Sequence, residues 1–389
     1  MSKLHRIEIL QAELAKQKLD GAFLFYSRDV YYYTGTAQPS YLVVTPNDYG
    51  LYVRSGYDFV LEEVFIDVSK IQEERKLEII YESWFKKAGF KTMATELDIL
   101  PVNQFYKYQK AFKGIELKDV SPLILEQRKT KDENEIKQLE KACQAIDAGH
   151  KAVVSGTLAG LSELEVAAKV ENAHRLAEHD GCFFFRLPDF FMSRGPSASG
   201  PNLSKFSGVV YSITGVGLGA SVPIGPSRRV IEAGDPVMVD IPTSVNGYHA
   251  DQTRTYFAVK ASHQLKDLYE ALKEIHETVI KTIRPGMTGK AIYQFAMKTA
   301  AKLKMEAPFL SFGNSKKSML IGHGIGLEVN EPPIISSYSN EVIGENHVIA
   351  IEMHMYQENV GVIKLEDTVI IGKDSNRWLT FSSRDLIEL

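Results

Sequence analysis

The spacing of apolar residues in the first third of the chain alternates between helical and strand periods. Apolar residues recur at close to helical spacing from Leu4 to Lys18, and the apolar run at 22–26 indicates a buried strand. The same pattern predicts strands at 40–45, 50–53, 92–96 and 115–119, and helices at 60–65, 76–87 and 101–112. This alternation is typical of an α/β domain. The stretch 126–134 is highly charged and has no apolar member, so we expect one domain over residues 1–128 and another over residues 129–389.

The second part of the chain contains a similarity between two pairs of expected helices. A long helix at 132–154 precedes a shorter one that opens at Ser162, and a long helix at 264–282 precedes one that opens at Thr288. Both hydroxyl residues stand where a helix N-cap belongs, and strand-like sequence follows each pair. The pattern predicts an α+β domain with an internal pseudo-twofold repeat and a site between its halves. Two amphipathic helices that resemble each other by chance are the alternative.

Composition narrows the class of protein. The 389 residues carry 45 Lys plus Arg against 49 Asp plus Glu, a net charge of -4, which argues against a dedicated nucleic-acid-binding protein. Only two cysteines, Cys143 and Cys182, are present, so a disulfide scaffold and a cysteine-rich zinc site are excluded. No apolar stretch reaches 18 residues and no signal-peptide core opens the chain, so we expect no membrane span and a cytoplasmic location.

Two aspartates stand on either side of a predicted hairpin turn. Asp240 ends an apolar run, Asn246-Gly247 is a hairpin-type dipeptide, and Asp251 lies in the strand-like segment 247–255. A hairpin would bring the two carboxylates together, and a divalent metal is the usual solution to their repulsion. The alternative is that Asp240 caps a turn and Asp251 pairs with Arg254.

A histidine and two glutamates extend this set. His323 is flanked by glycines that would allow a close approach to a ligand, while Glu352 and Glu366 lie in apolar strand-like runs. A buried glutamate is costly unless it is neutralised or bound to a cation. Four carboxylates and one imidazole suit two divalent cations that share carboxylates, and oxygen-rich ligands favour Mn, Fe, Co or Zn.

These motifs resemble those of the aminopeptidase P, prolidase and methionine aminopeptidase family (M24), the metallopeptidases of pita-bread fold. The resemblance rests on Asp240 with Asp251–Thr255, on Gly322–Leu327, on Glu352 and on Glu366–Thr368. Asp20-Gly21-Ala22 and Tyr33-Thr34-Gly35 extend it to a creatinase-like N-terminal domain.

The resemblance implies a dinuclear-metal hydrolase similar to Xaa-Pro aminopeptidase or dipeptidase. Its metal ligands would be Asp240, Asp251, His323, Glu352 and Glu366. A metal-bound hydroxide would attack the amide carbonyl, with Glu352 as catalytic proton acceptor. The resemblance further implies a homodimer that acts on a small peptide or other small-molecule substrate.

The sequence departs from the family at two histidines that contact the scissile amide. Ile224 and Asn330 stand at those positions, and no histidine lies between His179 and His249 or between His323 and His347. Ile224 cannot form a hydrogen bond through its side chain, and Asn330 cannot carry a proton. We expect both positions in the substrate-binding region, with a different substrate, a different reaction or weak peptidase activity as the consequence.

Two other histidines could supply the missing function. His354 lies two residues after Glu352, and His249 two residues before Asp251, so each shares a strand face with a predicted ligand. We predict a catalytic role for His354 and a substrate-binding role for His249, with a supporting or rim position as the alternative for both. The aromatic and then Ser/Gly/Pro-rich segment 183–202 would line the pocket or form an ordinary surface loop.

The sequence leaves three functions open. The first is the Xaa-Pro-type metallohydrolase. The second is a metal-dependent non-peptidase of the same fold, either a lyase or a small-molecule amide hydrolase. The third is a non-catalytic binding protein, against which the complete ligand set argues, because four unneutralised carboxylates would repel one another.

Overall fold

The computed structural model describes residues 5–187, 192, 195–207, 212–313 and 316–389. It divides into two compact units, Met1–Arg128 with Arg186–Pro188, and Lys129–Phe185 with Asp189–Leu389. The grouping of Arg186 and Leu187 with the first unit has no counterpart in the sequence pattern. Across the described residues no helix is long and apolar enough to cross a membrane.

The first unit is built on a six-stranded sheet in the order β4-β3-β2-β1-β5-β6. Its strands are β1 (Ala22–Leu24), β2 (Ser40–Val44), β3 (Tyr49–Val53), β4 (Ile71–Glu73), β5 (Thr92–Thr95) and β6 (Glu116–Asp119). Its helices are α1 (His5–Lys16), α2 (Ser27–Thr34), α3 (Tyr57–Glu63), α4 (Leu77–Ile80), α5 (Val102–Ala111) and α6 (Ser121–Lys129), with the 3-10 turn η1 (Val68–Lys70) and the π-helix η2 (Tyr81–Lys86). The sheet mixes parallel and antiparallel pairs, as expected for an α/β unit with short connections.

Aromatic side chains form the core of this unit. Phe23 of β1 contacts Tyr41, Phe85, Tyr108 and Phe112 at ring-centroid distances of 4.7–6.5 Å. The predicted helix at 60–65 begins earlier, at Tyr57, and the predicted helix at 76–87 is α4 continued by a π-helix. Strand β4 was not predicted, because only one of its three residues is buried and so no alternation is visible.

The second unit holds two larger sheets and four long helices. Its helices are α7 (Glu133–Val154), α8 (Glu163–Leu176), α9 (His263–Thr282) and α10 (Gly289–Lys302), with the 3-10 turn η3 (Gly200–Ser204). One sheet orders β13-β10-β7 and the other β15-β14-β16-β17-β18, and two-stranded ribbons join β11 to β12 and β8 to β9. The strands are β7 (Ser197–Ser199), β8 (Phe206–Ser207), β9 (Ser212–Ile213), β10 (Pro236–Asp240), β11 (Thr243–Val245), β12 (Tyr248–Ala250), β13 (Thr253–Phe257), β14 (Leu320–Gly324), β15 (Glu331–Ser336), β16 (Val348–Gln357), β17 (Gly361–Ile370) and β18 (Arg377–Trp378).

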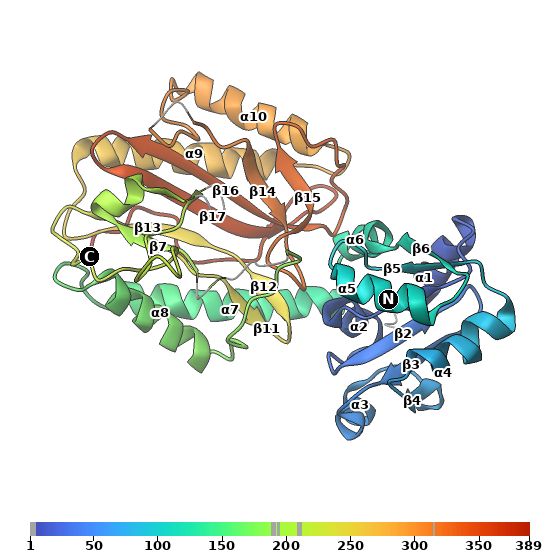
Figure 1. Cartoon of the computed structure of the whole chain (residues 1–389). Helices are drawn as coiled ribbons and strands as arrows, with labels where there is room; N and C mark the ends of the chain where they lie inside the picture. The colour runs from blue at the N-terminus through green and yellow to red at the C-terminus, as the bar shows by residue number, and fades with distance from the viewer. Residues whose placement is uncertain (1–4, 188–191, 193–194, 208–211, 314–315) are drawn as a thin grey trace. The chain divides into compact units, whose positions relative to one another are not determined.

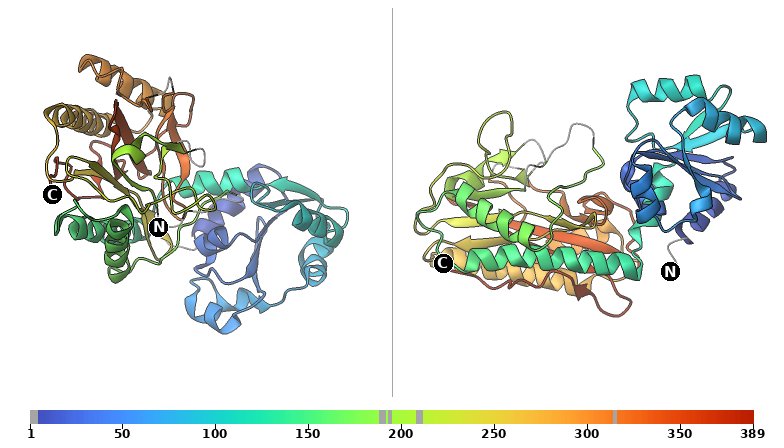
Figure 2. Two further views of the ribbon diagram at one scale, coloured as in Figure 1. Left: turned by 60° about the vertical axis from the view of Figure 1, so that its left-hand side comes forward. Right: turned by 90° about the horizontal axis from the view of Figure 1, so that it is seen from below.

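The strands of this unit lie between two helix pairs. Figure 1 shows α9 and α10 on one side and α7 and α8 on the other, and the turned views of Figure 2 keep that order. The apolar faces of α9 and α10 pack on β14, β16 and β17, whereas α8 packs on β10 and β13. Buried strands with helices on both outer faces produce the layered α+β architecture that the sequence predicts.

The two halves of this unit repeat one set of local contacts. Ser162 caps α8 and Thr288 caps α10, each hydroxyl accepting a hydrogen bond from the backbone N–H three residues on. Gly160 N–H donates to the carbonyl of Ile231, and Gly286 N–H donates in the same way to that of Ile343. Further paired bonds follow, from Ile231 N–H to Leu161 and from Ile343 N–H to Met287. These equivalent bonds support the predicted pseudo-twofold repeat.

Candidate metal centre

The two aspartates lie at one end of the paired strands β10 and β13: Asp240 is the last residue of β10, and Asp251 lies two residues before β13 begins. Strand β10 ends at Asp240, which pairs with Thr253 of β13, and the Asn246-Gly247 turn instead closes the separate ribbon β11–β12. The expected continuous strand over 247–255 is therefore interrupted at Asp251 and Gln252. This break frees Asp251 from the strand ladder. Its backbone N–H and carbonyl both bond to the hydroxyl of Thr368, at 3.0 and 2.8 Å.

The glutamates and the histidine come from three neighbouring strands. Glu352 of β16 and Glu366 of β17 are direct cross-strand partners, so their side chains leave the sheet on one face. His323 of β14 pairs with Ala350, two residues before Glu352. The cluster thus requires the registers of β14, β16 and β17, together with the break beside β13.

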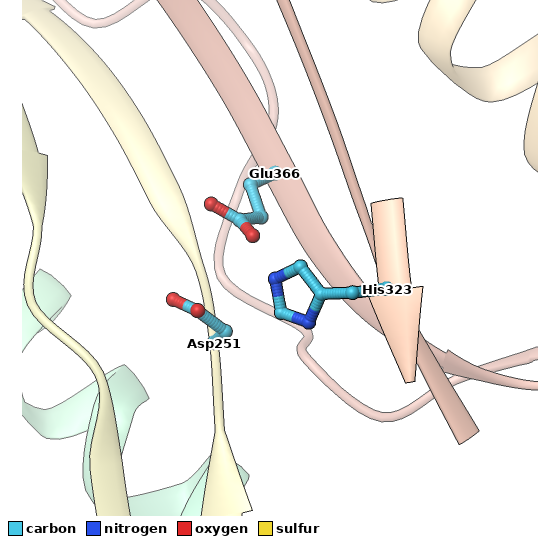
Figure 3. Close-up of side chains that lie close together, drawn as sticks. All are labelled: Asp251, His323 and Glu366. Atoms are coloured by element: carbon cyan, nitrogen blue, oxygen red, sulfur yellow. The ribbon is translucent and has the colours of Figure 1, made fainter. Parts of the chain in front are cut away.

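Three of these side chains converge closely enough to bind one metal ion. Ligand atoms of Asp251, His323 and Glu366 all lie within 4.8 Å of one another, and all three residues are buried (Figure 3). Nδ1 of His323 donates to the carbonyl of Gly324 at 3.0 Å, which leaves Nε2 with a lone pair for a ligand. Oδ1 of Asp251 is buried and has no hydrogen-bond partner among the described residues. A divalent cation would satisfy both atoms, so the residues fit this group.

Burial and repulsion between neighbouring carboxylates shift the pKa values of the acidic residues in the cluster. Burial raises the pKa of Asp251 well above its ordinary value, and the neighbouring Glu366 and Asp240 add to the effect. Burial also raises the pKa of Glu366 to about 8, against the opposing influence of Lys364. Glu352 differs: burial would raise its pKa, but Lys364 and His323 outweigh burial and lower it. Burial and the neighbouring carboxylates therefore favour the protonated forms of Asp251 and Glu366, whereas Lys364 favours the ionised form of Glu352.

Among the described residues, Lys364 is the cationic side chain within the cluster, and the sequence analysis did not identify it. Its ammonium nitrogen lies 2.7 Å from Oδ2 of Asp240, 2.8 Å from Oε2 of Glu352 and 3.1 Å from Oε2 of Glu366. Lys364 is buried and stands opposite His354 in the β16–β17 ladder. A signal was available, because Lys364 precedes Glu366 by two residues on a strand and therefore shares its face.

Buried polar side chains form hydrogen bonds with the predicted ligand Glu366 and with its neighbour Asp367. Thr253 donates its hydroxyl to Oε2 of Glu366 at 2.7 Å. The guanidinium of Arg254 donates to the carbonyl of Glu366 at 2.7 Å and to Oδ1 of Asp367 at 2.7 Å. Arg254 therefore pairs with Asp367, not with Asp251, and the alternative reading of Asp251 as its salt-bridge partner is wrong.

The cluster opens into a cavity of about 740 Å³. All five predicted metal ligands line it, together with Lys364, His354 and Asn330. Its apolar wall consists of Phe185, Met192, Phe206, Ile213, Phe312, Met319, Leu320 and Val329. Part of the predicted lining segment 183–202 therefore reaches the cavity, while residues 188–191 and 193–194 of it lie outside the described residues.

His354 faces this cavity as its strand position predicted. Its ring stacks on Phe312 at a centroid distance of 4.5 Å, and its Nε2 is buried without a hydrogen-bond partner among the described residues. Burial, reinforced by Lys364, lowers the pKa of His354 to about 4. The ring is thus neutral near pH 7 and can exchange hydrogen bonds with a bound molecule.

The remaining predicted substrate-binding residues are placed differently. Asn330 lines the cavity, whereas Ile224 and His249 are buried and are not among its lining residues. His249 Nδ1 donates to the carbonyl of Gly326 at 3.0 Å, and its Nε2 accepts from the backbone N–H of Phe184 at 3.2 Å. Both ring nitrogens thus join segments of backbone. The strand-face argument could not foresee this, because those partners are remote in sequence.

Comparisons with known proteins match both parts of the chain. Residues 137–373 match the model of metallopeptidase family M24, and residues 6–130 match the creatinase/prolidase N-terminal domain. The Xaa-Pro dipeptidase of Pyrococcus horikoshii is 29% identical over 376 residues, covering 96% of this chain and 95% of the relative.

Solved structures of similar proteins match the chain over nearly its whole length. The prolidase structure from Pyrococcus horikoshii OT3 superposes with a TM-score of 0.81 at 28% identity, covering 98% of this chain and 100% of that one. The Xaa-Pro dipeptidase structure from Bacillus anthracis, with a TM-score of 0.84 at 23% identity and full coverage of both chains, supports the fold.

Proposed function

The chain belongs to metallopeptidase family M24, and we propose that this metallohydrolase cleaves Xaa-Pro peptides with the help of a divalent cation. The observation that carries the proposal is the convergence of Asp251, His323 and Glu366 in the lining of a mainly apolar cavity. Relatives described as Xaa-Pro dipeptidases support the substrate class. An apolar cavity suits the pyrrolidine ring of proline.

Three residues of the predicted ligand set are the proposed ligands of the cation. Asp251, His323 and Glu366 would hold it, with Mn, Co, Fe or Zn as the candidates because oxygen ligands dominate. When bound, a divalent cation supplies positive charge that polarises an amide carbonyl and lowers the pKa of water. The sequence predicts two such ions, with Asp240 and Glu352 as further ligands.

Glu352 is the proposed proton acceptor. Its side chain is 20% exposed, against 8% for Asp240 and 1% for Glu366, so it is the most open of these three carboxylates. It lines the cavity, and His323 of the neighbouring strand β14 pairs with Ala350, two residues before Glu352. A carboxylate in this position can accept a proton released near the scissile bond and return it to the leaving amine.

His354 and Asn330 are the proposed substrate-contacting residues. Phe312 holds the ring of His354 by stacking, and the free Nε2 of His354 can bond to a peptide amide. The amide of Asn330 can both donate and accept. If His354 has this role, the variant His354→Ala retains its metal but loses turnover. A variant with wild-type metal content and full turnover would contradict the assignment.

A substrate panel tests the function directly. Purified protein is stripped with a chelator, reloaded with Mn, Co, Fe or Zn, and offered Xaa-Pro dipeptides, Xaa-Pro tripeptides and matched Xaa-Ala peptides. Release of proline from the dipeptides is expected, with no release by the Asp251→Asn variant. Absence of turnover with every metal at full occupancy would overturn the peptidase assignment.

A non-peptidase of the same fold is the second candidate, and the replaced histidines favour it. Ile224 and Asn330 occupy positions where the resemblance predicts catalytic histidines, and His323 and His354 are the histidines lining the described cavity. Small-molecule amides belong in the same panel, because their hydrolysis without proline release would select this candidate. The predicted homodimer and cytoplasmic location stay predictions, and light scattering of the purified protein tests the first.

A further inference from the structure

Lysines from two parts of the chain line the cavity. Lys364 belongs to the candidate metal centre, whereas Lys316 and Lys317 lie in the segment between α10 and β14. The ammonium of Lys317 donates to the backbone carbonyls of Glu306 and, at 3.2 Å, of Phe309. Lys316 is exposed and forms no ion pair with a carboxylate within the described part of the chain. Its charge is therefore available to a molecule bound in the cavity.

An aromatic wall of the cavity positions this ammonium. The ring of Phe312 stacks on His354 at a centroid distance of 4.5 Å and meets the ring of Phe206 edge-on at 4.8 Å. The ammonium of Lys316 lies over Phe206, 4.8 Å from the ring centroid. The backbone N–H of Phe312 also donates to the carbonyl of Lys316 at 3.1 Å. Two phenyl rings thus connect the proposed substrate-contacting histidine to an ammonium that a cation–π contact orders.

The chemistry of this wall suits a substrate with a carboxylate. Burying an unpaired carboxylate in a mainly apolar cavity is costly, so such a substrate needs a cationic partner there. A hydrogen bond between an ammonium and a carboxylate is about twice as strong as one between neutral groups. Lys316 supplies this partner from outside the metal centre, on the wall that also carries His354.

We propose that Lys316 is a specificity-determining residue that binds a carboxylate of the substrate. The C-terminal carboxylate of a peptide is one source of this group, and an acidic side chain is the other. The inference rests on the proposed function for the reaction, but it concerns a binding contact that is measurable without turnover.

Matched substrates test the carboxylate preference. Protein reloaded with Mn²⁺ is offered Ala-Pro and Ala-Pro-Ala, each as the free acid and as the C-terminal amide. The pair Glu-Pro amide and Gln-Pro amide tests an acidic side chain. We expect the carboxylate-bearing member of at least one pair to have a kcat/KM about 10-fold above its neutral partner, because hydrogen bonds to charged groups contribute about that factor.

Three variants assign this preference to the lysine. Lys316→Met removes the charge at similar length and should raise KM about 10-fold for the carboxylate-bearing member of the preferred pair, but not for its neutral partner. Lys316→Arg keeps the charge and should keep the preference. Lys302→Met is the matched control, because Lys302 of α10 is an exposed lysine that is not among the lining residues of the cavity. A folded Lys316→Met protein with the wild-type preference would overturn the proposal.

The measurements also separate this inference from the proposed function. Peptide turnover by wild type with equal kcat/KM within all three pairs would refute the role of Lys316 and leave the function standing, whether or not Lys316→Met folds. If no peptide is cleaved, calorimetry measures the affinities of the same pairs. Tighter binding of a carboxylate-bearing member that is lost in Lys316→Met and kept in Lys316→Arg would support the role of Lys316 while the function fails. Equal affinities without turnover would refute both.

Discussion

The stability of the metal centre should depend on a buried arginine that contacts no metal. The guanidinium of Arg254 is fully enclosed and donates five hydrogen bonds of 2.7–2.9 Å. The acceptors are the carboxylate of Asp367 and the carbonyls of Thr253, Glu366, Ser382 and Ser383. Arg254→Met would leave Asp367 as a buried charge whose remaining partners are Arg384, Thr380 and, at 3.8 Å, His276.

The expected cost follows from these contacts. Removing one partner of a buried ion pair destabilises a protein by about 3–5 kcal/mol. For a domain of this size each kcal/mol lowers the midpoint of thermal unfolding by about 2–4 °C, so we expect a decrease of about 6–20 °C. Arg254 also holds the carbonyl of Glu366, and loss of such a supporting contact typically weakens metal binding about 10–100-fold.

Guanidinium chloride unfolding, followed by circular dichroism with and without Mn²⁺, measures the first effect, and calorimetric titration with Mn²⁺ measures the second. Arg377→Met is the matched control, because Arg377 pairs with Glu140 while 54% exposed and should cost less than about 1 kcal/mol. The double variant Arg254→Met with Asp367→Asn should recover much of the loss, since it removes the stranded charge. An Arg254→Met protein no less stable than Arg377→Met would refute the reasoning.

Three other predictions follow from single contacts. Asp251→Asn removes a charged ligand and should weaken Mn²⁺ binding by more than the roughly 10–100-fold that is typical of a supporting residue. Calorimetric titration measures this affinity, and an unchanged value would contradict the assignment of Asp251 as a ligand. Gly322→Ala would place a Cβ 2.4 Å from a backbone carbonyl oxygen and should cost about 1–3 kcal/mol in chemical unfolding, whereas Gly219→Ala meets nothing within 4 Å and should be near neutral. Burial, with a neighbouring aspartate, raises the pKa of Glu96 to about 8, so its contribution to stability is complete below about pH 4.5 and is lost as pH rises through about 8. Wild-type protein should therefore lose stability relative to Glu96→Gln between pH 5 and pH 9 in urea titrations, and parallel curves for the two proteins would disprove this.

Local signals in the sequence identified the elements and the ligand residues of the second unit. Ser162 and Thr288 indicate helix N-termini, because a hydroxyl at the N-cap accepts a hydrogen bond from a backbone N–H of the same helix. This local contact does not depend on the tertiary structure. The alternation within β16 correctly placed Glu352 and His354 on one face, because strand geometry has a period of two. The five candidate metal ligands were likewise identified from their local sequence, the family resemblance implied their role as a set, and the structure adds that three of them meet.

The tertiary structure alone decided which of these side chains meet, and with what partners. The position of Lys364 among three carboxylates depends on the register of β17 against β16 and on Asp240, which lies 124 residues earlier. Strand periodicity predicted a role near the site for His249 as for His354. The two ring nitrogens of His249 instead bond to backbone groups that are far away in sequence, and His249 does not line the cavity. Periodicity specifies a face, but distances between charges arise from the packing of remote strands, and those distances determine the pKa values of the buried carboxylates.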